Sequence, residues 1–361
     1  MENKFYLSPS LFTDRETLVL ENGSMKAYAF RYSTGVCAIK IENEKGFFII
    51  LPYQGQQVWR AEFLGQPLVM RTHFDEPVPT LNYLDTYGGF LLHCGVRNMG
   101  NPEPGYPHHG EIPNAPYQTA FLLSGEDEKG RYIAVSGHRE LNTAFVLHYR
   151  FTPECRLYAD GTVLNVKVTL ENLRGYEMPY MYLCHINFRP IDGGELVYST
   201  KYDKEHITVC KPPYSENPTP EQKALYDYMD AVQENPALHH KVGEKGQCYD
   251  PEICFIVRYL ADENGMAHTM QKLPDGKAFY VSHPTEALPV GVRWISRTKD
   301  EGSMGMVLPA TAEHHGRSHA EATGQMKFLA PHSSISFSLV AGILEEDCAK
   351  KVEEKIKSIV K

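Results

Sequence analysis

VLNVKVTLEN, residues 163–172, alternates apolar and polar side chains with a period of two. Leu164 and Val166 fall on one face, and Asn165 and Lys167 on the other. This alternation is typical of a β-strand that buries one face. Similar runs, rich in Val, Ile, Tyr, Phe and Thr, occur at 26–32, 37–42, 47–52, 131–137, 145–151, 179–188, 254–260, 291–296 and 334–343. Because turn residues rather than helices separate them, the sequence predicts an all-β sandwich or barrel instead of a parallel βαβ sheet.

One segment between the strand runs favours a helix. TPEQKALYDYMDAV, residues 219–232, begins with Thr219 as an N-cap, Pro220 at the first helical position and Gln222 three residues after the cap. This is the pattern of a capping box with a helix-start proline. The segment belongs to a polar stretch, 211–250, which we interpret as a helical insertion on the β scaffold.

The C-terminal residues 345–361 form a second helical pattern. Ala349, Val352, Ile356 and Ile359 follow one another at three- and four-residue steps, which makes one apolar stripe. We expect this helix to pack on the outside of a sheet. The sequence shows neither repeats nor a clear linker, so we predict a single domain over 1–361.

The composition limits the classes of partner. The 361 residues are 42% hydrophobic, which is enough for a large core, and the formal net charge is -9. This charge argues against nucleic acid or an anionic membrane as a partner, since both require clustered Lys and Arg. The N-terminus lacks a signal-peptide pattern, and no run approaches the roughly 18 apolar residues of a membrane helix. From the lack of both patterns we expect a cytoplasmic protein, in whose reducing compartment the eight cysteines, which form no CxxC pair, are free thiols.

Histidine-rich segments are the candidates for chemistry. Residues 88–117 carry Arg97, His108, His109 and Glu111 among glycines and prolines, as loops near a ligand often do. An ordered loop whose polar side chains bond their own backbone is an equally weighted alternative.

Two further segments contain histidines. His185 and Asn187 share one face of the strand run 179–188, where His185 is either functional or a satisfied core histidine. The segment 308–325 is polar and, taken alone, favours a solvated loop. Its candidate residues are Glu313, His314, His315, Arg317 and His319.

Metal and cofactor motifs are weak. His109 and Glu111 are of the residue types that ligate zinc or iron, but their spacing matches no tight signature. The sequence contains no GxGxxG, GxxxxGK[ST] or GxSxG pattern, which argues against dinucleotide binding, P-loop chemistry and the common hydrolase motif. We therefore expect neither a metal nor a cofactor.

Taken together, the motifs resemble the galactose mutarotase-like superfamily, and in particular its aldose 1-epimerase-like proteins. In these proteins an Arg-Asn element leads into a His-Gly element, and Arg97, Asn98, His109 and Gly110 fit those places. The resemblance extends from about residue 25 to residue 343. Its colinear segments are 55–68, 87–100, 108–114, 182–188, 278–294 and 307–339.

A strand of the family is similar to YLCHINF, residues 182–188. The family strand reads Asn-His-x-Tyr-Phe-Asn, so His185 and Phe188 match while Cys184 replaces the first Asn. The resemblance implies a large antiparallel β-sandwich, the galactose mutarotase-like supersandwich, with one or two peripheral helices and a sugar bound on a concave face.

The resemblance also implies a reaction, the interconversion of sugar anomers by ring opening, without a cofactor. One histidine acts as general acid on the ring oxygen and a glutamate as general base on the anomeric hydroxyl. Carried over by position, His185 is the acid, His109 the second histidine, and Arg97 a group that binds sugar hydroxyls. The candidate sugar-binding residues are Arg97, Asn98, Asn187, Arg189, Arg60, His315 and Arg317.

The sequence departs from the family at the general base. The family's closing segment reads Glu-Pro there, whereas this chain reads Leu308-Pro309. Glu313 and Glu111 are the candidate substitutes. Loss of base catalysis, or a different reaction, is the alternative.

Three functions stay open at this point. The first is an aldose 1-epimerase-like enzyme acting on a free or modified sugar. The second is another sugar isomerase or epimerase, metal-assisted through His93, His109, Glu111 and His185. The third is a non-catalytic carbohydrate-binding protein, which Leu308 favours. The partner is a small-molecule sugar in each case, and the insertion either covers the site or forms the contact of a homodimer.

Overall fold

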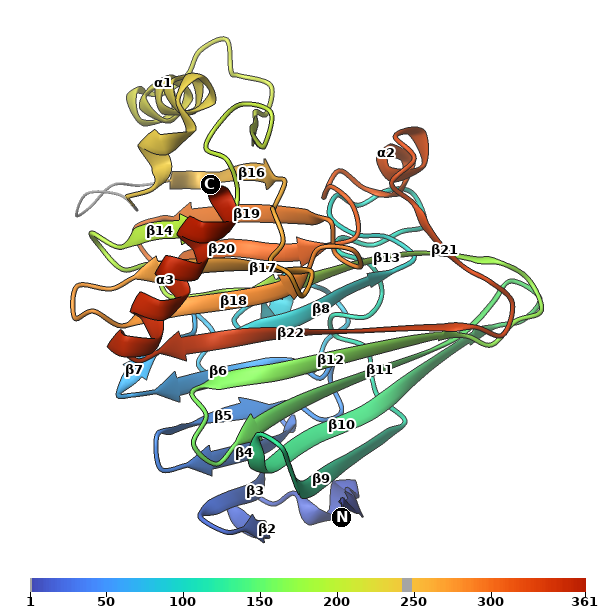
Figure 1. Cartoon of the computed structure of the whole chain (residues 1–361). Helices are drawn as coiled ribbons and strands as arrows, with labels where there is room; N and C mark the ends of the chain where they lie inside the picture. Colours follow the sequence, from blue (N-terminus) through green and yellow to red (C-terminus); the bar gives the residue numbers. More distant parts are fainter. Residues whose placement is uncertain (1, 242–248) are drawn as a thin grey trace.

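The computed structural model describes residues 2–241 and 249–361, and their strands form two antiparallel sheets (Figure 1). The first sheet has nine strands, in the order β1 (Asn3–Tyr6), β9 (Thr119–Asp127), β10 (Gly130–Thr143), β11 (Leu147–Tyr158), β12 (Val163–Asn172), β22 (Ser334–Leu344), β18 (Ala278–Pro284), β17 (Met266–Lys272) and β14 (Glu195–Tyr198). The all-β sandwich predicted from the strand pattern is confirmed.

The second sheet has thirteen strands among the described residues. Its main path is β15 (Ile207–Cys210), β16 (Tyr249–Val257), β19 (Val290–Arg297), β20 (Gly302–Ala310), β13 (Met178–Ile186), β8 (Leu91–Val96), β6 (Val58–Phe63), β5 (Gly46–Ile50), β4 (Cys37–Asn43), β3 (Met25–Arg31) and β2 (Thr17–Asn22). The two shorter strands are β7 (Gln66–Pro67), which pairs with β6, and β21 (Lys327–Leu329), which pairs with β13.

Strand β12 has the bounds that its alternating pattern predicts. It pairs with β11 on one side and β22 on the other, so its backbone groups are satisfied along both edges. Leu164, Val166 and Val168 are buried, whereas Lys167 is exposed. The period of two therefore does separate a core face from a solvent face.

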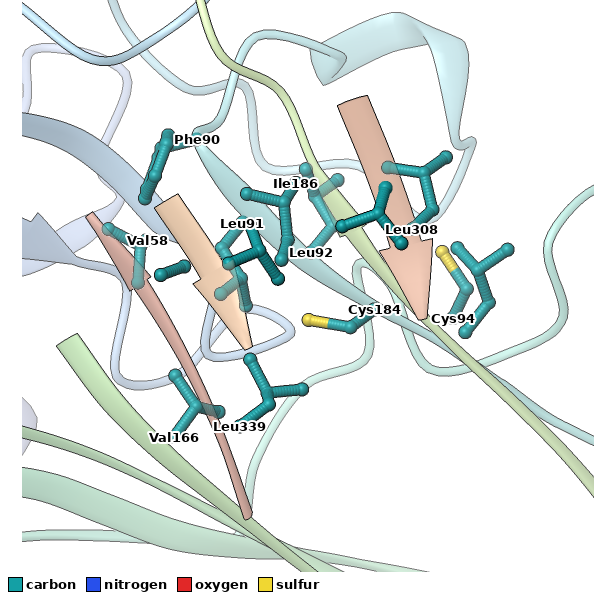
Figure 2. Packing of buried hydrophobic residues seen from close by; sticks show 14 of the residues in the cluster. Val58, Phe90, Leu91, Leu92, Cys94, Val166, Cys184, Ile186, Leu308 and Leu339 are labelled. Atoms are coloured by element: carbon teal, nitrogen blue, oxygen red, sulfur yellow. The ribbon is translucent and has the colours of Figure 1, made fainter. Parts of the chain in front are cut away.

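The main core fills the space between the two sheets. Figure 2 shows Cys184 of β13 on the side where Val166 and Leu339 of the other sheet lie, while Leu308 and Cys94 lie together on the opposite side of the strands. Phe188 lies two residues after the end of β13 and stacks on Phe279 of β18, with ring centroids 4.9 Å apart. This aromatic contact joins one sheet to the other.

The stretch 211–250, predicted as a helical insertion, contains α1 (Pro220–Glu234) followed by the 3-10 turn η3 (Pro236–His239). The predicted capping box is confirmed, because Thr219 Oγ1 accepts from the Gln222 amide at 3.2 Å and Gln222 Oε1 accepts from the Thr219 amide at 3.0 Å. Helix α1 packs against β15 and β16, at one end of the thirteen-stranded sheet (Figure 1). The part of the predicted insertion at 242–248 lies outside the described residues.

The remaining helical elements of the described residues are three short segments and the C-terminal helix α3. They are η1 (Pro9–Leu11), η2 (Leu84–Thr86) and the short α2 (Arg317–Ala322), the last lying where the sequence alone favours a solvated loop. The predicted C-terminal helix is α3 (Glu346–Val360), which buries Ala349 and Ile356 against Met270 and Tyr280 of the nine-stranded sheet. None of the described helices is long and apolar enough to cross a membrane.

Asp262 fastens α3 to the sheet. Its carboxylate accepts from His268 Nε2 at 3.0 Å, from the Met266 amide at 2.9 Å, and from Lys355 of α3. Burial acts to raise the pKa of Asp262, but the hydrogen bonds from Lys355, Met266 and His268 outweigh it and hold the pKa well below its usual value. Asp262 therefore contributes stability above about pH 4, and this contribution is lost as the pH falls toward the lowered pKa.

We expect Asp262→Ala to lower the free energy of unfolding by about 1.5–3 kcal/mol at pH 7, because several charge-assisted hydrogen bonds are lost. The difference between wild type and variant should shrink as the pH is taken below about 4. Urea unfolding of both proteins at several pH values measures this. A difference that stays constant down to pH 2 would contradict the assigned role of the ionised carboxylate.

Candidate functional site

A cavity of about 170 Å³ lies on the face of the thirteen-stranded sheet that is turned away from the nine-stranded sheet. The alternation of side chains along β8 and β13 shows that the cavity lies on this face of the sheet. His93 of β8 points into the space between the sheets, where its ring meets that of Phe151 at 5.5 Å. Cys184 is the cross-strand partner of His93 and points the same way, so the next residue, His185, points to the opposite face and into the cavity.

The cavity walls combine aromatic rings, imidazoles and one carboxylate. Its side chains come from β13, β16, β19 and β20 and from three loops. The lining residues are Tyr83, Leu84, Tyr87, Gly100, Asn101, His108, His109, Leu183, His185, Glu252, Cys254, Val292, Trp294, Leu308 and His314. Such a mixture of apolar walls and a few converging polar groups is typical of a small-molecule site.

His185 is held by Asn187, which lies two residues further along the chain. Its Nδ1 lies 2.7 Å from Asn187 Oδ1, and Asn187 in turn donates from Nδ2 to the Gly89 carbonyl at 3.0 Å. Because Oδ1 can only accept, Nδ1 carries the proton and Nε2 holds a lone pair. Burial lowers the pKa of His185 to about 3, so the ring is neutral at pH 7.

His109 lies beside His185, with ring centroids 5.2 Å apart. Its backbone adopts φ 57, and the next residue, Gly110, adopts φ 82. A Cβ at Gly110 would lie 2.1 Å from the Gly95 carbonyl oxygen, so only glycine fits this close approach. The loop therefore depends on Gly110 to hold His109 over the cavity.

The tautomer of His109 is the opposite of that of His185. The Gly100 amide donates to His109 Nδ1 at 3.4 Å, which leaves the proton of the neutral ring on Nε2. Burial, together with His185 nearby, lowers the pKa of His109 well below its usual value. The cavity thus contains two neutral imidazoles, one with an accepting Nε2 and one with a donating Nε2.

Glu252 supplies the carboxylate of the cavity, and no other carboxylate lines it in the described part of the chain. Its Oε2 accepts a hydrogen bond of 2.5 Å from Nε1 of Trp294. Glu252 is not among the residues predicted from the sequence, because it precedes the predicted strand run 254–260 and belongs to no motif. The alternation of β16 gives the one usable signal, since Glu252 and Cys254 share a face and both line the cavity.

A larger cavity of about 920 Å³ adjoins the first and shares Asn101, Glu252, Cys254 and His314 with it. Its other walls come from β15, α1 and the segment before α2. Glu313 and His315, both predicted as site residues, line this larger cavity and not the smaller one. Glu313 is already bound, because it accepts from Arg258 and from His319 Nε2, the latter at 3.0 Å.

Arg97 and Glu111 do not reach the smaller cavity. The Arg97 guanidinium lies 5.0 Å from the ring centre of Tyr106. Glu111 accepts from the Tyr149 hydroxyl at 2.7 Å and from the Arg97 amide at 3.3 Å. Burial raises the pKa of Glu111. The predicted convergence of Arg97, His109 and His185 on one hollow is therefore correct for the two histidines and wrong for Arg97.

The metal set His93, His109, Glu111 and His185 is not gathered either. His93 points into the core and bonds the Tyr182 hydroxyl at 2.7 Å, on the opposite face of the sheet from His185. Glu111 is engaged with Tyr149, which belongs to the nine-stranded sheet. The cross-strand partner of His93 is Cys184, so His93 points to the face opposite His185, and this register between β8 and β13 cannot be derived from the sequence.

The remaining sugar-binding candidates bind protein groups. Asn98 Nδ2 donates to the carbonyls of Asn101 and Pro107, both at 3.0 Å, and so shapes the loop that carries His109. Arg60, Arg189 and Arg317 each donate to backbone carbonyls. None of these four lines the smaller cavity. Asn187 acts on the cavity only through the orientation of His185.

Leu308 lines the cavity at the position where the resemblance places the missing glutamate. It pairs with Val292 across β20 and β19, and both side chains form an apolar patch of the wall. A carboxylate is thus absent at this point of the described wall, and Glu252 approaches from β16 instead.

Comparisons with known proteins bear on the fold. A family model described as a domain of unknown function, DUF4432, matches residues 33–204, which is less than half of the chain. No curated protein matches the sequence. A candidate aldose 1-epimerase from Klebsiella pneumoniae subsp. pneumoniae is similar in structure, with a TM-score of 0.81 at 16% identity over 99% of this chain and 96% of that one.

Two other crystal structures share the architecture. A galactose mutarotase-like protein from Clostridium acetobutylicum has a TM-score of 0.60 at 15% identity, covering 89% of this chain and 99% of its own. A galactose mutarotase related enzyme from Lactobacillus acidophilus has a TM-score of 0.55 at 12% identity, covering 86% and 98%. Likeness at such low identity speaks for the fold alone. The two-sheet architecture, its strand order and these structures together establish that the chain has the galactose mutarotase-like fold.

Proposed function

We propose that this protein is an aldose 1-epimerase-like isomerase that opens and recloses the ring of a reducing sugar. The observation that carries the proposal is the gathering of His109, His185 and Glu252 around one cavity with aromatic walls. Ring opening requires a proton to leave the anomeric hydroxyl and the ring oxygen to be stabilised as its bond to carbon breaks. A site for this reaction needs an acceptor and a donor on different sides of the sugar.

The three polar groups divide these roles according to their protonation. Glu252 takes the proton of the anomeric hydroxyl, and Nε2 of His185 accepts a hydrogen bond from a neighbouring hydroxyl. Nε2–H of His109 donates to the ring oxygen and passes it the proton as the bond between that oxygen and the anomeric carbon breaks. After rotation about the C1–C2 bond the ring recloses, the ring oxygen returns its proton to His109, and Glu252 returns the other to the new anomeric oxygen. A neutral imidazole can serve as such an electrophile when its surroundings suppress the imidazolium form. The roles of the two histidines are thereby exchanged relative to the assignment by resemblance.

Tyr83, Tyr87 and Trp294 support the binding of a sugar. Their rings line the cavity beside His109 and His185. Aromatic rings offer a rigid apolar surface to the C–H face of a sugar, and the polar groups then fix its hydroxyls. The adjoining larger cavity leaves room for a substituent, which favours a modified sugar over a bare hexose.

Polarimetry with a panel of reducing sugars tests the proposal. We expect the purified protein to accelerate the mutarotation of at least one hexose, pentose or modified sugar, because positioned acid and base groups each contribute about 10²- to 10⁴-fold. Sugars that bind in calorimetry but are not turned over would favour the non-catalytic carbohydrate-binding function, which Leu308 in the wall supports. A broad panel without binding or acceleration contradicts both functions.

A further inference from the structure

Cys210, His314 and His315 form a group of metal-ligating side chains in the wall of the larger cavity. Their ligand atoms, one from each residue, all lie within 4.8 Å of one another. Across residues 2–241 and 249–361, no other group of three or more His, Cys, Asp or Glu side chains meets this spacing. None of the three residues belongs to the metal set His93, His109, Glu111 and His185 that the sequence suggested.

The fold brings the three residues together from two distant segments. Cys210 is the last residue of β15, the edge strand beside α1. His314 and His315 belong to the loop between β20 and α2, where the Asn101 amide donates to the His314 carbonyl at 3.1 Å. The two histidine rings lie 4.6 Å apart. A loop fixed by backbone bonds to its neighbour is a suitable support for ligands.

The distances suit a transition metal. Three atoms within 4.8 Å of one another lie at most about 2.8 Å from a common centre, whereas zinc bonds nitrogen at about 2.0–2.1 Å and sulfur at about 2.3 Å. Small rotations of the three side chains would bring their ligand atoms to these bond lengths. One sulfur and two imidazole nitrogens are ligands for a borderline-soft ion such as zinc, whereas magnesium and calcium require oxygen.

Two further observations point to a cation. His314 Nδ1 is buried and has no hydrogen-bond partner among the described residues, which is unfavourable for a polar atom unless a ligand engages the ring. The ring of His315 meets that of His319 at 4.9 Å, and His319 is bonded to the Glu313 carboxylate. Glu313 bonds His319 and not a ligand, but its negative charge lies beside the group and favours a bound cation.

We propose that Cys210, His314 and His315 bind one zinc ion and leave its fourth position open to the larger cavity. Three protein ligands with an open position are characteristic of catalytic zinc rather than structural zinc. His314 lines the smaller cavity as well, so a molecule bound near His109 and His185 can extend toward the ion. The ion would stabilise charge on an oxygen of that molecule. The zinc site does not depend on the proposed mutarotation.

Cobalt substitution tests the site directly. The full-length protein is freed of metal with a chelator and titrated with Co²⁺, a spectroscopic substitute for zinc. We expect a sulfur-to-cobalt charge-transfer band that saturates at one equivalent, is displaced by Zn²⁺, and is lost in Cys210→Ser. His314→Ala and His315→Ala should each weaken Zn²⁺ binding by at least about 100-fold in calorimetry, because even outer partners of a metal contribute 10- to 100-fold.

Matched variants control for adventitious binding. Cys348 is an exposed thiol and His73 an exposed histidine, both outside the group. Cys348→Ser and His73→Ala should keep the full band and affinity. The wild-type titration alone overturns the proposal if no saturable band appears at one equivalent, so the result does not rest on the folding of a variant. A band that survives in Cys210→Ser but disappears in Cys348→Ser would also overturn it.

Discussion

Glu252→Gln is expected to lower the rate of catalysed mutarotation by about 10²- to 10⁴-fold while leaving the structure intact. The amide keeps the shape of the side chain and an oxygen for the Trp294 Nε1 hydrogen bond, but it cannot take a proton. Because no other carboxylate lines the smaller cavity in the described residues, no neighbour can replace it there. Polarimetry of both proteins, on the sugar found in the panel, measures the loss.

The matched control for this variant is Glu286→Gln. Glu286 is exposed and lines neither cavity. The substitution therefore removes the same charge as Glu252→Gln without changing the site. Its rate should equal that of the wild type within a factor of two or so. If Glu252→Gln retains more than about a tenth of the wild-type rate, the proton acceptor is another group, such as Nε2 of His185.

Phe188→Ala is expected to lower the free energy of unfolding by about 3–5 kcal/mol, the range for removing a fully buried aromatic ring. Phe188 is 0% exposed and contacts the rings of Phe90 at 5.0 Å and Phe279 at 4.9 Å. Since Phe279 belongs to the opposite sheet, the truncation leaves a cavity at a junction where neither sheet can move inward alone. Urea or thermal unfolding gives the value.

Phe145→Ala provides the comparison for this stability measurement. Phe145 is 100% exposed, so its removal should change the free energy of unfolding by no more than about 0.5 kcal/mol. A loss below about 1 kcal/mol for Phe188→Ala would show that the two sheets hold together without this aromatic contact.

The sequence predicts features whose cause is local. The bounds of β12 follow from its alternating side chains, and the start of α1 follows from Thr219, Pro220 and Gln222. In both cases the residues that decide the structure are adjacent in the chain. The resemblance to mutarotase-like proteins extended this local information to the fold, because it relied on the order of the motifs.

The site is less predictable because its members belong to loops and distant strands. Residue type and motif position selected Arg97, but the loop turns its side chain onto Tyr106. Glu252 has no motif and became a candidate only when β16 placed it beside Trp294. The pKa of His185 also depends on its burial, which a sequence pattern does not reveal. The direction of a side chain, its neighbours and its burial all depend on the tertiary structure.

Neighbouring residues of strand β13 serve two different purposes, because their side chains point to opposite faces of the sheet. Cys184 and Ile186 face the other sheet, whereas Leu183 and His185 face the cavity. Exchanges on one side alter how firmly the molecule holds together, and exchanges on the other alter which compounds it accepts. In this chain, odd-numbered positions of the strand can therefore change the ligand specificity, while the even-numbered ones hold the two sheets together.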